Sequence, residues 1–418
     1  MEQFHHGNDV PPLAENTDKE CVKMMHNTLS VIMFMMVASL LPGSSFAQEP
    51  TPRVTLTVRE TAGIRRFGYP VTMTTTLPVA LLADVGHARL IQLPKGNAVP
   101  SQMTVTSRHA DGSIENLEID VIQSPGPLET MQFQLETGSE VTAVSAQSGL
   151  EMSETDEFYQ VSAYRIPKDL RSLVQQVNYR RDYLRGNGLR VAAVEGNVTH
   201  DPAEARSIVW TVEKRGPLQV RLRCRGVYPA TNSLDELPFE LVLEFVSSKS
   251  WIGITHRIPK TSGRRIRLET IADFELQGQL LWDLDTGYWL YGVLESGDSL
   301  TFSRTARDWQ CELTSHSGTS VYAKSLPENR VARGWGHFQE AHTDGNVVAF
   351  GLAESDHHDS LAITMTSNGT LTATSVPRIG EASIQQRIFF HFVPVPLQHT
   401  ARTSPPSMML HLEQDKSK

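Results

Sequence analysis

Residues 205–214, ARSIVWTVEK, and residues 217–226, PLQVRLRCRG, alternate between apolar and polar side chains with a period of two. In the second stretch, every other residue from Val220 to Cys224 falls on one face, and arginines occupy the opposite face. Successive side chains of a strand point to opposite sides, so this pattern is typical of strands with one buried face. The two stretches therefore predict long antiparallel strands of a large sheet.

Similar patterns continue on both sides of these stretches. Short strands rich in β-branched residues, separated by turn signals, run from Arg53 to Glu136 and predict a barrel or sandwich of about 90 residues. Longer alternating segments from Phe239 to Val393 predict a large antiparallel sandwich. We therefore predict an all-β protein. Its predicted parts are an N-terminal extension and signal peptide (1–47), a small β-barrel (48–143), a large β-sandwich (144–412) and a polar tail (413–418).

Composition limits the classes of partner. The 418 residues include 38 Lys and Arg against 47 Asp and Glu, which gives a formal net charge of -9. A nucleic-acid-binding protein needs a basic face to neutralise phosphates, so we expect no nucleic acid as a partner. A local arginine cluster would still allow an anionic polysaccharide.

The N-terminus has the features of a targeting segment. Lys23 precedes an apolar run over residues 29–41, Pro42 and Gly43 follow it, and Ala47 ends a small-residue cleavage motif. This order is typical of a secretory signal peptide, and the run is short for a membrane-spanning helix. We predict a secreted or periplasmic protein with no transmembrane anchor after cleavage. An uncleaved anchor is the alternative.

Two cysteines, Cys224 and Cys311, follow the targeting segment, and each lies in an alternating pattern that turns it toward a core. In an exported protein they could form a disulfide. They could equally be two buried free thiols that pack as small hydrophobic groups. Two cysteines without a CxxC motif do not support a structural zinc site, and we predict neither a metal nor a cofactor.

Four motifs occur in order within residues 53–136: ETAG (60–63), GYPV (68–71), VPSQ (99–102) and DGS (111–113). In this order they resemble the N-terminal barrel domain of exo-rhamnogalacturonan-lyase-like proteins. The later stretch RGWGHFQEAHTDGNVVAFGLAE (333–354) resembles the central sandwich of the same family, which belongs to the mutarotase-like supersandwich class. The resemblance implies a barrel followed by a supersandwich, and a polysaccharide or oligosaccharide partner, including uronate polymers.

The sequence departs from that family in two places. Relatives typically carry a Trp after the DGS turn, where this chain has Asn116 and Leu117. Full-length relatives continue into a helical toroid that carries the lyase chemistry, and the sequence after Val393 does not resemble one. The resemblance thus implies a relative of polysaccharide lyases without the catalytic domain.

Residues 333–354 also hold the strongest candidate site, because aromatic, imidazole and carboxylate groups gather there before a predicted core strand, Val347–Phe350. We predict a Gly-bracketed turn that carries His337 and leads to Glu340. As a mutarotase-type acid and base, we assign His337 and Glu340 the catalytic roles. The predicted ligand-binding residues are Trp335, Phe338, His342, Trp289, Tyr183 and Arg181.

Other chemistries remain open at this stage. His342 with Glu354 is a second acid–base pair, and lyase chemistry could use the arginines of 179–185 and 264–267 with Tyr183 or His337 as base. A glycosidase needs two facing carboxylates, for which Asp283 and Asp285 are candidates. The run at 356–359, Asp-His-His-Asp, reads as a solvated turn, because neighbouring strand residues point in opposite directions.

Three hypotheses of function follow. The first is an exported carbohydrate-binding or accessory protein, in which aromatic rings and a few polar groups hold a saccharide. The second is an active sugar enzyme, either a polysaccharide lyase or a mutarotase or epimerase. The third is a structural module that docks a separate catalytic chain.

Overall fold

The structure is a computed structural model. Residues 52–418 belong to one compact unit. No helix in the described part of the chain is long and apolar enough to cross a membrane. The described residues are 54–61, 63, 65–146, 149–179, 181–231, 235–261, 263–276, 278–285, 289–305, 308–315, 317–324, 335–341, 345–353, 358–378, 381–393 and 412–414.

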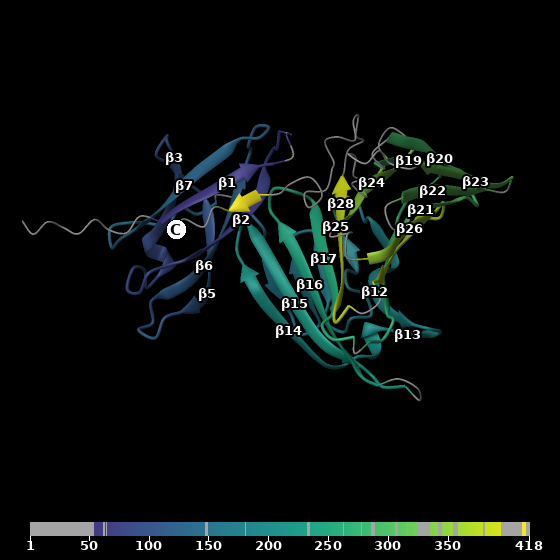
Figure 1. Ribbon diagram of the computed structural model, residues 1–418, viewed down its shortest axis with the longest axis horizontal. Helices are drawn as coiled ribbons and strands as arrows, with labels where there is room; N and C mark the ends of the chain where they lie inside the picture. Colours follow the sequence, from purple (N-terminus) through teal and green to yellow (C-terminus); the bar gives the residue numbers. More distant parts are fainter. Residues whose placement is uncertain are drawn as a thin grey trace, which may run out of the picture. The chain divides into compact units, whose positions relative to one another are not determined.

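Two sheets form the small N-terminal domain (Figure 1). The first has the order β29 (Leu412–Gln414), β1 (Val54–Glu60), β7 (Thr130–Thr137), β3 (Ala88–Leu93) and β4 (Asn97–Val99). The second has the order β2 (Tyr69–Thr76), β6 (Ile114–Gln123) and β5 (Ser101–Arg108), and the short helix η1 spans Val85–His87.

The core of this barrel-like domain follows from the period-two pattern of its strands. In β1, Leu56 and Val58 are buried, as are Met73 of β2 and Phe133 of β7. Trp251, which lies in the following sandwich, belongs to the same cluster of buried side chains. The small domain therefore shares part of its core with the sandwich.

Three further sheets form the large sandwich. The nine-stranded sheet has the order β14 (Arg206–Arg215), β15 (Gln219–Tyr228), β16 (Leu237–Val246), β17 (Trp251–Ile258), β28 (Ile384–Val393), β25 (Val347–Ala353), β24 (Trp335–Glu340), β19 (Leu280–Asp285) and β20 (Trp289–Leu294). The eight-stranded sheet has the order β13 (Val198–His200), β12 (Leu184–Glu195), β18 (Arg267–Phe274), β27 (Thr370–Pro377), β26 (His358–Thr366), β21 (Ser299–Thr305), β22 (Asp308–Ser315) and β23 (Gly318–Lys324). The four-stranded sheet has the order β11 (Gln176–Val177), β10 (Tyr164–Pro167), β9 (Phe158–Val161) and β8 (Met152–Glu154), and η2 spans Pro202–Glu204.

One cluster of buried apolar side chains joins these sheets, and strand β15 shows why. Val220, Leu222 and Cys224 have no exposed surface, so the apolar face of the predicted strand lies in the core. Strands β14 to β17 and β28 run side by side as Figure 1 shows, and all their pairings are antiparallel. The predicted fold class is confirmed in that the chain is all-β, with a small N-terminal domain before a large antiparallel sandwich.

Two details differ from the expectation. Residues Leu412–Gln414, which we had assigned to the end of the sandwich and the polar tail, form β29 beside β1 of the small domain. The physical reason is that a short strand can join the edge of a sheet through backbone hydrogen bonds alone, so its own sequence need not show a hydrophobic pattern. Residues Trp335–Glu340 form strand β24, although we had predicted a turn there. The domain boundary at residues 143 and 144 stays a prediction.

Both cysteines are buried free thiols. Cys224 lies on the nine-stranded sheet and Cys311 on the eight-stranded sheet. Burial raises the pKa of each thiol to about 12. Of the two predicted alternatives, the structure contains the free thiols and not the disulfide between Cys224 and Cys311.

Candidate functional site

The nine-stranded sheet has one face in the core of the sandwich, and we call the opposite face the outer face. On β15 the alternation that buries Val220 and Leu222 places Arg221 and Arg223 on the outer face. On β28 the same alternation buries Ile388 and Phe390 in the core cluster and places Arg387 on the outer face. This face therefore combines polar residues from strands that are far apart in the sequence.

A network of ion pairs covers the outer face of β15 and β16. Glu244 lies 3.0 Å from Arg221 and 2.8 Å from Arg387. Burial alone would raise the pKa of Glu244, but the guanidinium groups of Arg387 and Arg221 outweigh it and lower that pKa. Glu240 likewise lies 3.0 Å from both Arg223 and Arg225. Both carboxylates are therefore already paired with guanidinium groups.

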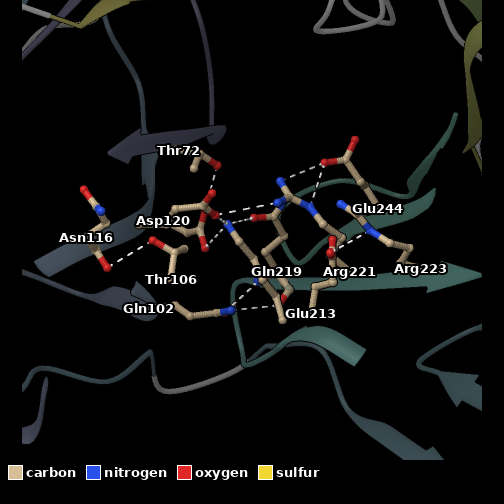
Figure 2. A network of polar contacts seen from close by, with 12 residues as sticks. Thr72, Gln102, Thr106, Asn116, Asp120, Glu213, Gln219, Arg221, Arg223 and Glu244 are labelled. Atoms are coloured by element: carbon tan, nitrogen blue, oxygen red, sulfur yellow. Dashed lines mark hydrogen bonds and ion pairs between the residues drawn. The ribbon is translucent and has the colours of Figure 1, made fainter. Parts of the chain in front are cut away.

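The same network reaches into the small domain, as Figure 2 shows. Lys214 is 2% exposed, and its ammonium donates to both carboxylate oxygens of Asp120 at 2.9 Å and to Oε1 of Gln219 at 2.8 Å. Glu118 lies 2.7 Å from the same ammonium, and Thr72 donates to Asp120 at 2.6 Å. A buried charge with this many partners fixes the small domain on the sheet.

Gln102 makes a second polar contact at the junction between the small domain and the nine-stranded sheet. Its side-chain oxygen accepts from the backbone N–H groups of Leu218 and Gln219 at 3.0 and 2.9 Å, and its amide donates to the Gln219 carbonyl at 2.9 Å. A methyl group at Gly216 would lie 2.3 Å from Cδ of Gln102, so only glycine leaves room for it. The junction is therefore closely fitted as well as charged.

Aromatic side chains continue the junction toward the centre of the sheet. The Tyr69 ring of the small domain lies 6.1 Å from the Trp251 ring, which lies 6.4 Å from the His391 ring. In the neighbouring row, Arg387 lies 5.0 Å from the centroid of the Phe389 ring. Such rings can pack against the apolar faces of a sugar while nearby polar groups bind its hydroxyls.

Three residues on adjacent central strands, which we call the imidazole row, follow Trp251 across the sheet. Trp251 pairs with His391, His391 with Ala349, and Ala349 with His337. Two strand spacings place the backbones of the two histidines about 10 Å apart, with the small Ala349 between them. His391 is partly exposed, whereas His337 is 7% exposed. The row thus brings a predicted site residue next to one that the sequence analysis did not select.

His337 is a neutral imidazole at neutral pH. Burial lowers its pKa from 6.5 to about 4. Among the described residues, none forms a hydrogen bond with its buried Nδ1 atom. A buried polar atom without a partner costs about 1–3 kcal/mol, so such an atom calls for an explanation.

The structure does not bring the predicted acid and base together. Regular pairing along β24 places Glu340 on the same face as the core residue Phe338, and His337 on the outer face. Glu340 is 2% exposed and accepts a hydrogen bond of 2.6 Å from the backbone N–H of Asn346. The pairing of His337 with Glu340 is therefore wrong, because residues three apart on a strand point to opposite faces.

Two predicted ligand-binding residues lie in the core. Phe338 is 1% exposed and stacks on Phe350 with ring centroids 5.6 Å apart. Tyr183 is 1% exposed and lies edge-on to Phe392 at 5.4 Å. A saccharide could reach these rings only if the sandwich opened. Arg181, by contrast, is exposed.

Other candidates are described only in part. Trp335 and Trp289 are both register partners of Asp285, and their side chains lie outside the described part of the chain. Asp283, one of the two predicted glycosidase carboxylates, is the register partner of His337. His342 lies outside the described residues, as do Glu354 and residues 356–357.

Two of the arginines proposed for lyase chemistry have acidic partners. Arg264 is within 2.5 Å of Glu195, and Arg267 is within 2.7 Å of Glu269. These guanidinium groups are therefore neutralised without a ligand. Within the described ranges, no group of three or more His, Cys, Asp or Glu side chains could hold a metal ion.

The sequence analysis missed Arg387, Phe389, His391 and Glu244. A signal for the first three was present, since they recur every second residue in the strand QQRIFFHFV. That spacing puts an arginine, an aromatic ring and an imidazole on one face. Their closeness to Glu244 and His337 depends on pairing between distant strands, which no local pattern reports.

No known protein family matches the chain, and no curated protein matches it in sequence. The chain is similar to the structure of an α-mannosidase from Enterococcus faecalis V583, at 9% identity and a TM-score of 0.51, over 88% of this chain and 46% of that one. A glycosyl hydrolase family 38 protein from Enterococcus faecalis gives 10% identity and a TM-score of 0.52, over 87% and 47%. The chain thus spans less than half the length of these proteins. At such identities the similarity concerns the fold alone.

A third solved structure is a galactose mutarotase related enzyme from Lactobacillus acidophilus. It gives 8% identity and a TM-score of 0.29, over 59% of this chain and 100% of that one. The specific resemblance to exo-rhamnogalacturonan-lyase-like proteins stays a prediction.

Proposed function

We propose that this protein binds a saccharide on the outer face of the nine-stranded sheet, at the imidazole row His337, Ala349 and His391. The observation that supports the proposal is the buried Nδ1 of His337, for which no described residue is a partner, in one row with a partly exposed second imidazole. A neutral imidazole has one donor and one acceptor nitrogen, and a sugar hydroxyl both donates and accepts. The two groups are therefore complementary.

The neighbouring groups support a neutral saccharide at this face. Arg387 lies on the same face of β28, four residues before His391, and Glu244 already neutralises it at 2.8 Å. A carboxylated ligand would have to compete with Glu244 for that guanidinium group. Phe389 is 6% exposed and Ala349 has no exposed surface, so the partly exposed His391 is the part of the row that a saccharide would contact first.

Catalysis at the same row is the second candidate, because a neutral histidine can accept a proton. A pKa of about 4 makes His337 a weak base at neutral pH. General bases work best when their pKa lies near the working pH. The value therefore favours binding over an epimerase or mutarotase reaction. Docking to a separate catalytic chain would add to this role without replacing it.

Export is the remaining part of the proposal. The apolar run at 29–41 and the small-residue motif ending at Ala47 support a cleaved signal peptide. Expression of the full chain in a secreting host, followed by mass determination of the product, tests this part. A mature chain that begins near Gln48 supports export, whereas an intact cytoplasmic chain contradicts it.

Binding is tested by calorimetric titration of the full chain with rhamnogalacturonan, galactan and mannan oligosaccharides. We expect binding of at least one of them, weakened by about tenfold in His391→Ala, which corresponds to the loss of one good hydrogen bond. Arg225→Ala on the same sheet is the matched control and should leave affinity unchanged. Absence of binding across a broad glycan array would contradict the proposal.

A further inference from the structure

A cavity of about 640 Å³ lies beside the four-stranded sheet, and none of its lining residues belongs to the nine-stranded sheet. Phe158 of β9 and Arg165 of β10 form one wall. Asp156, Asp169 and Asn187 line other parts of it. Cavities of roughly 300–1,000 Å³ are typical of small-molecule sites, so this one has room for a monosaccharide.

Arg165 is the cation in this cavity for which no acidic partner occurs among the described residues. Its guanidinium carbon lies 4.1 Å from the centroid of the Phe158 ring, and its buried Nε has no hydrogen-bond partner there. The neighbouring cations differ, since Lys168 lies 2.8 Å from Glu154 and Arg171 lies 3.4 Å from Asp169. The ring holds the Arg165 guanidinium in place and leaves its charge uncompensated.

The backbone around the cavity is held in uncommon conformations. Leu170 is 4% exposed and has a φ of 61°, which is a left-handed conformation that is strained for a leucine. Gly186 and Asn187 also line the cavity, and they belong to β12, whose pairing shifts register between Leu184 and Leu189. Within that shift, a methyl group at Gly188 would lie 2.3 Å from the carbonyl oxygen of Val174. Strained residues and bulges of this kind gather at binding sites.

We propose that this cavity binds a uronic acid unit, that is, a sugar ring that carries one carboxylate. The planar guanidinium of Arg165 would donate two parallel hydrogen bonds to the carboxylate. Asp156, Asp169 and Asn187 would bind the ring hydroxyls. The acidic side chains also oppose a ligand with several negative charges, such as a phosphorylated sugar, and so favour a monoanion rich in hydroxyls.

This site is distinct from the imidazole row, and the proposal does not depend on saccharide binding at the outer face. The two sites also differ in charge preference. On the outer face Arg221 and Arg387 are paired with Glu244, whereas Arg165 in the cavity has no acidic partner among the described residues. A polymer with alternating neutral and acidic sugars could use both.

Titration calorimetry with galacturonate and glucuronate, and with galactose and glucose as neutral counterparts, tests the proposal on the full chain. We expect a uronate to bind at least about tenfold more tightly than its neutral counterpart, because a charged hydrogen bond is worth more than a neutral one. Arg165→Gln should abolish that difference. Arg171→Gln, which changes a paired arginine on the same rim, should retain it.

Two further measurements separate this proposal from others. Arg165→Lys keeps the charge and loses the paired donors, so it should bind uronate about tenfold more weakly than the parent while its melting temperature confirms folding. His391→Ala should leave uronate affinity unchanged, since it alters the other site. Equal affinity of the parent and Arg165→Gln for uronate, or no uronate binding by the parent, would overturn the proposal.

Discussion

The two halves of the outer face of the nine-stranded sheet use polar residues differently. Across β15 and β16, Glu240 and Glu244 each lie within 3.0 Å of two arginines. Across β24 and β25, the face carries the neutral imidazole of His337 and the methyl group of Ala349. The guanidinium and carboxylate groups of the first half form ion pairs, although Nε of Arg387 is also buried without a described hydrogen-bond partner. The second half contains the buried Nδ1 of the neutral His337, which has no described partner.

We interpret the charged half as the part that stabilises the fold, and the imidazole half as the part that binds the ligand that we propose. Buried charges are costly to desolvate, so they remain in a folded protein when several partners surround them. Lys214 meets that condition and joins the small domain to the sheet. The unpartnered Nδ1 of His337 is also costly, and no described residue offsets that cost, so our proposal assigns this atom to a ligand.

The largest expected effect comes from removing the buried cation. Lys214→Met leaves Asp120 and Glu118 without their shared partner, and breaking a buried ion pair costs about 3–5 kcal/mol. Urea unfolding should show a lower free energy of unfolding by that amount. The control is Lys95→Met, which replaces an exposed lysine and should change the free energy by less than about 0.5 kcal/mol. Equal stability of the two variants would show that the charged half does not hold the junction.

The next effect is the change in the free energy of unfolding that acid causes through His337 of the imidazole half. The folded-state pKa of His337 is about 4, below the ordinary 6.5, so the unfolded chain takes up a proton first as the pH falls. Stability from this group is present above pH 6.5 and is lost from there down to pH 4, at about 1.4 kcal/mol per pH unit. Free energies of unfolding measured at pH 7, 6, 5 and 4 should show this slope reduced by His337→Gln.

A second buried histidine checks that acid prediction. His256 has no exposed surface, its Nε2 lies 3.1 Å from the Tyr228 hydroxyl, and burial lowers its pKa to about 3. Its contribution should extend the loss of stability below pH 4, where that of His337 has ended. An unchanged slope between pH 6.5 and 4 in His337→Gln is incompatible with a buried neutral imidazole at this position.

A smaller effect is expected for the exposed edge of the charged half. Arg225 is 65% exposed and pairs with Glu240 at 3.0 Å. Exposed ion pairs contribute little because water and salt screen them, so Arg225→Ala should change the free energy of unfolding by less than about 0.5 kcal/mol. A thermal melt in low and high salt measures this. A loss comparable to that of Lys214→Met would mean that the pairs act as one unit.

The sequence predicts the strands of this fold well, because burial on one side leaves a period-two pattern. Val220, Leu222 and Cys224 are in the core as that pattern indicates. The free thiols could not be chosen over a disulfide, since their assignment to different sheets depends on long-range pairing. Strand β29 was missed for a related reason, as its contacts with β1 are made by the backbone.

The site was predicted only in part. His337 lies on the outer face, but its expected partner Glu340 lies on the opposite face, because these residues form a strand instead of a turn. Phe338 and Tyr183 were selected for their aromatic rings, which serve the core. His391 and Arg387 come close to the site through the pairing of β28 with β17 and β25. Such a juxtaposition depends on sheet order, which one sequence does not reveal.

The central claim is that the imidazole row binds a saccharide, and nitrogen NMR of the histidine side chains tests it most directly. The ¹⁵N-histidine-labelled chain would be titrated with the oligosaccharide that binds most tightly in calorimetry. We predict that the signals of His337 and His391 shift in step with binding, while the signal of His256, buried in the core, stays in place. Binding that leaves the signals of His337 and His391 unchanged would contradict the account.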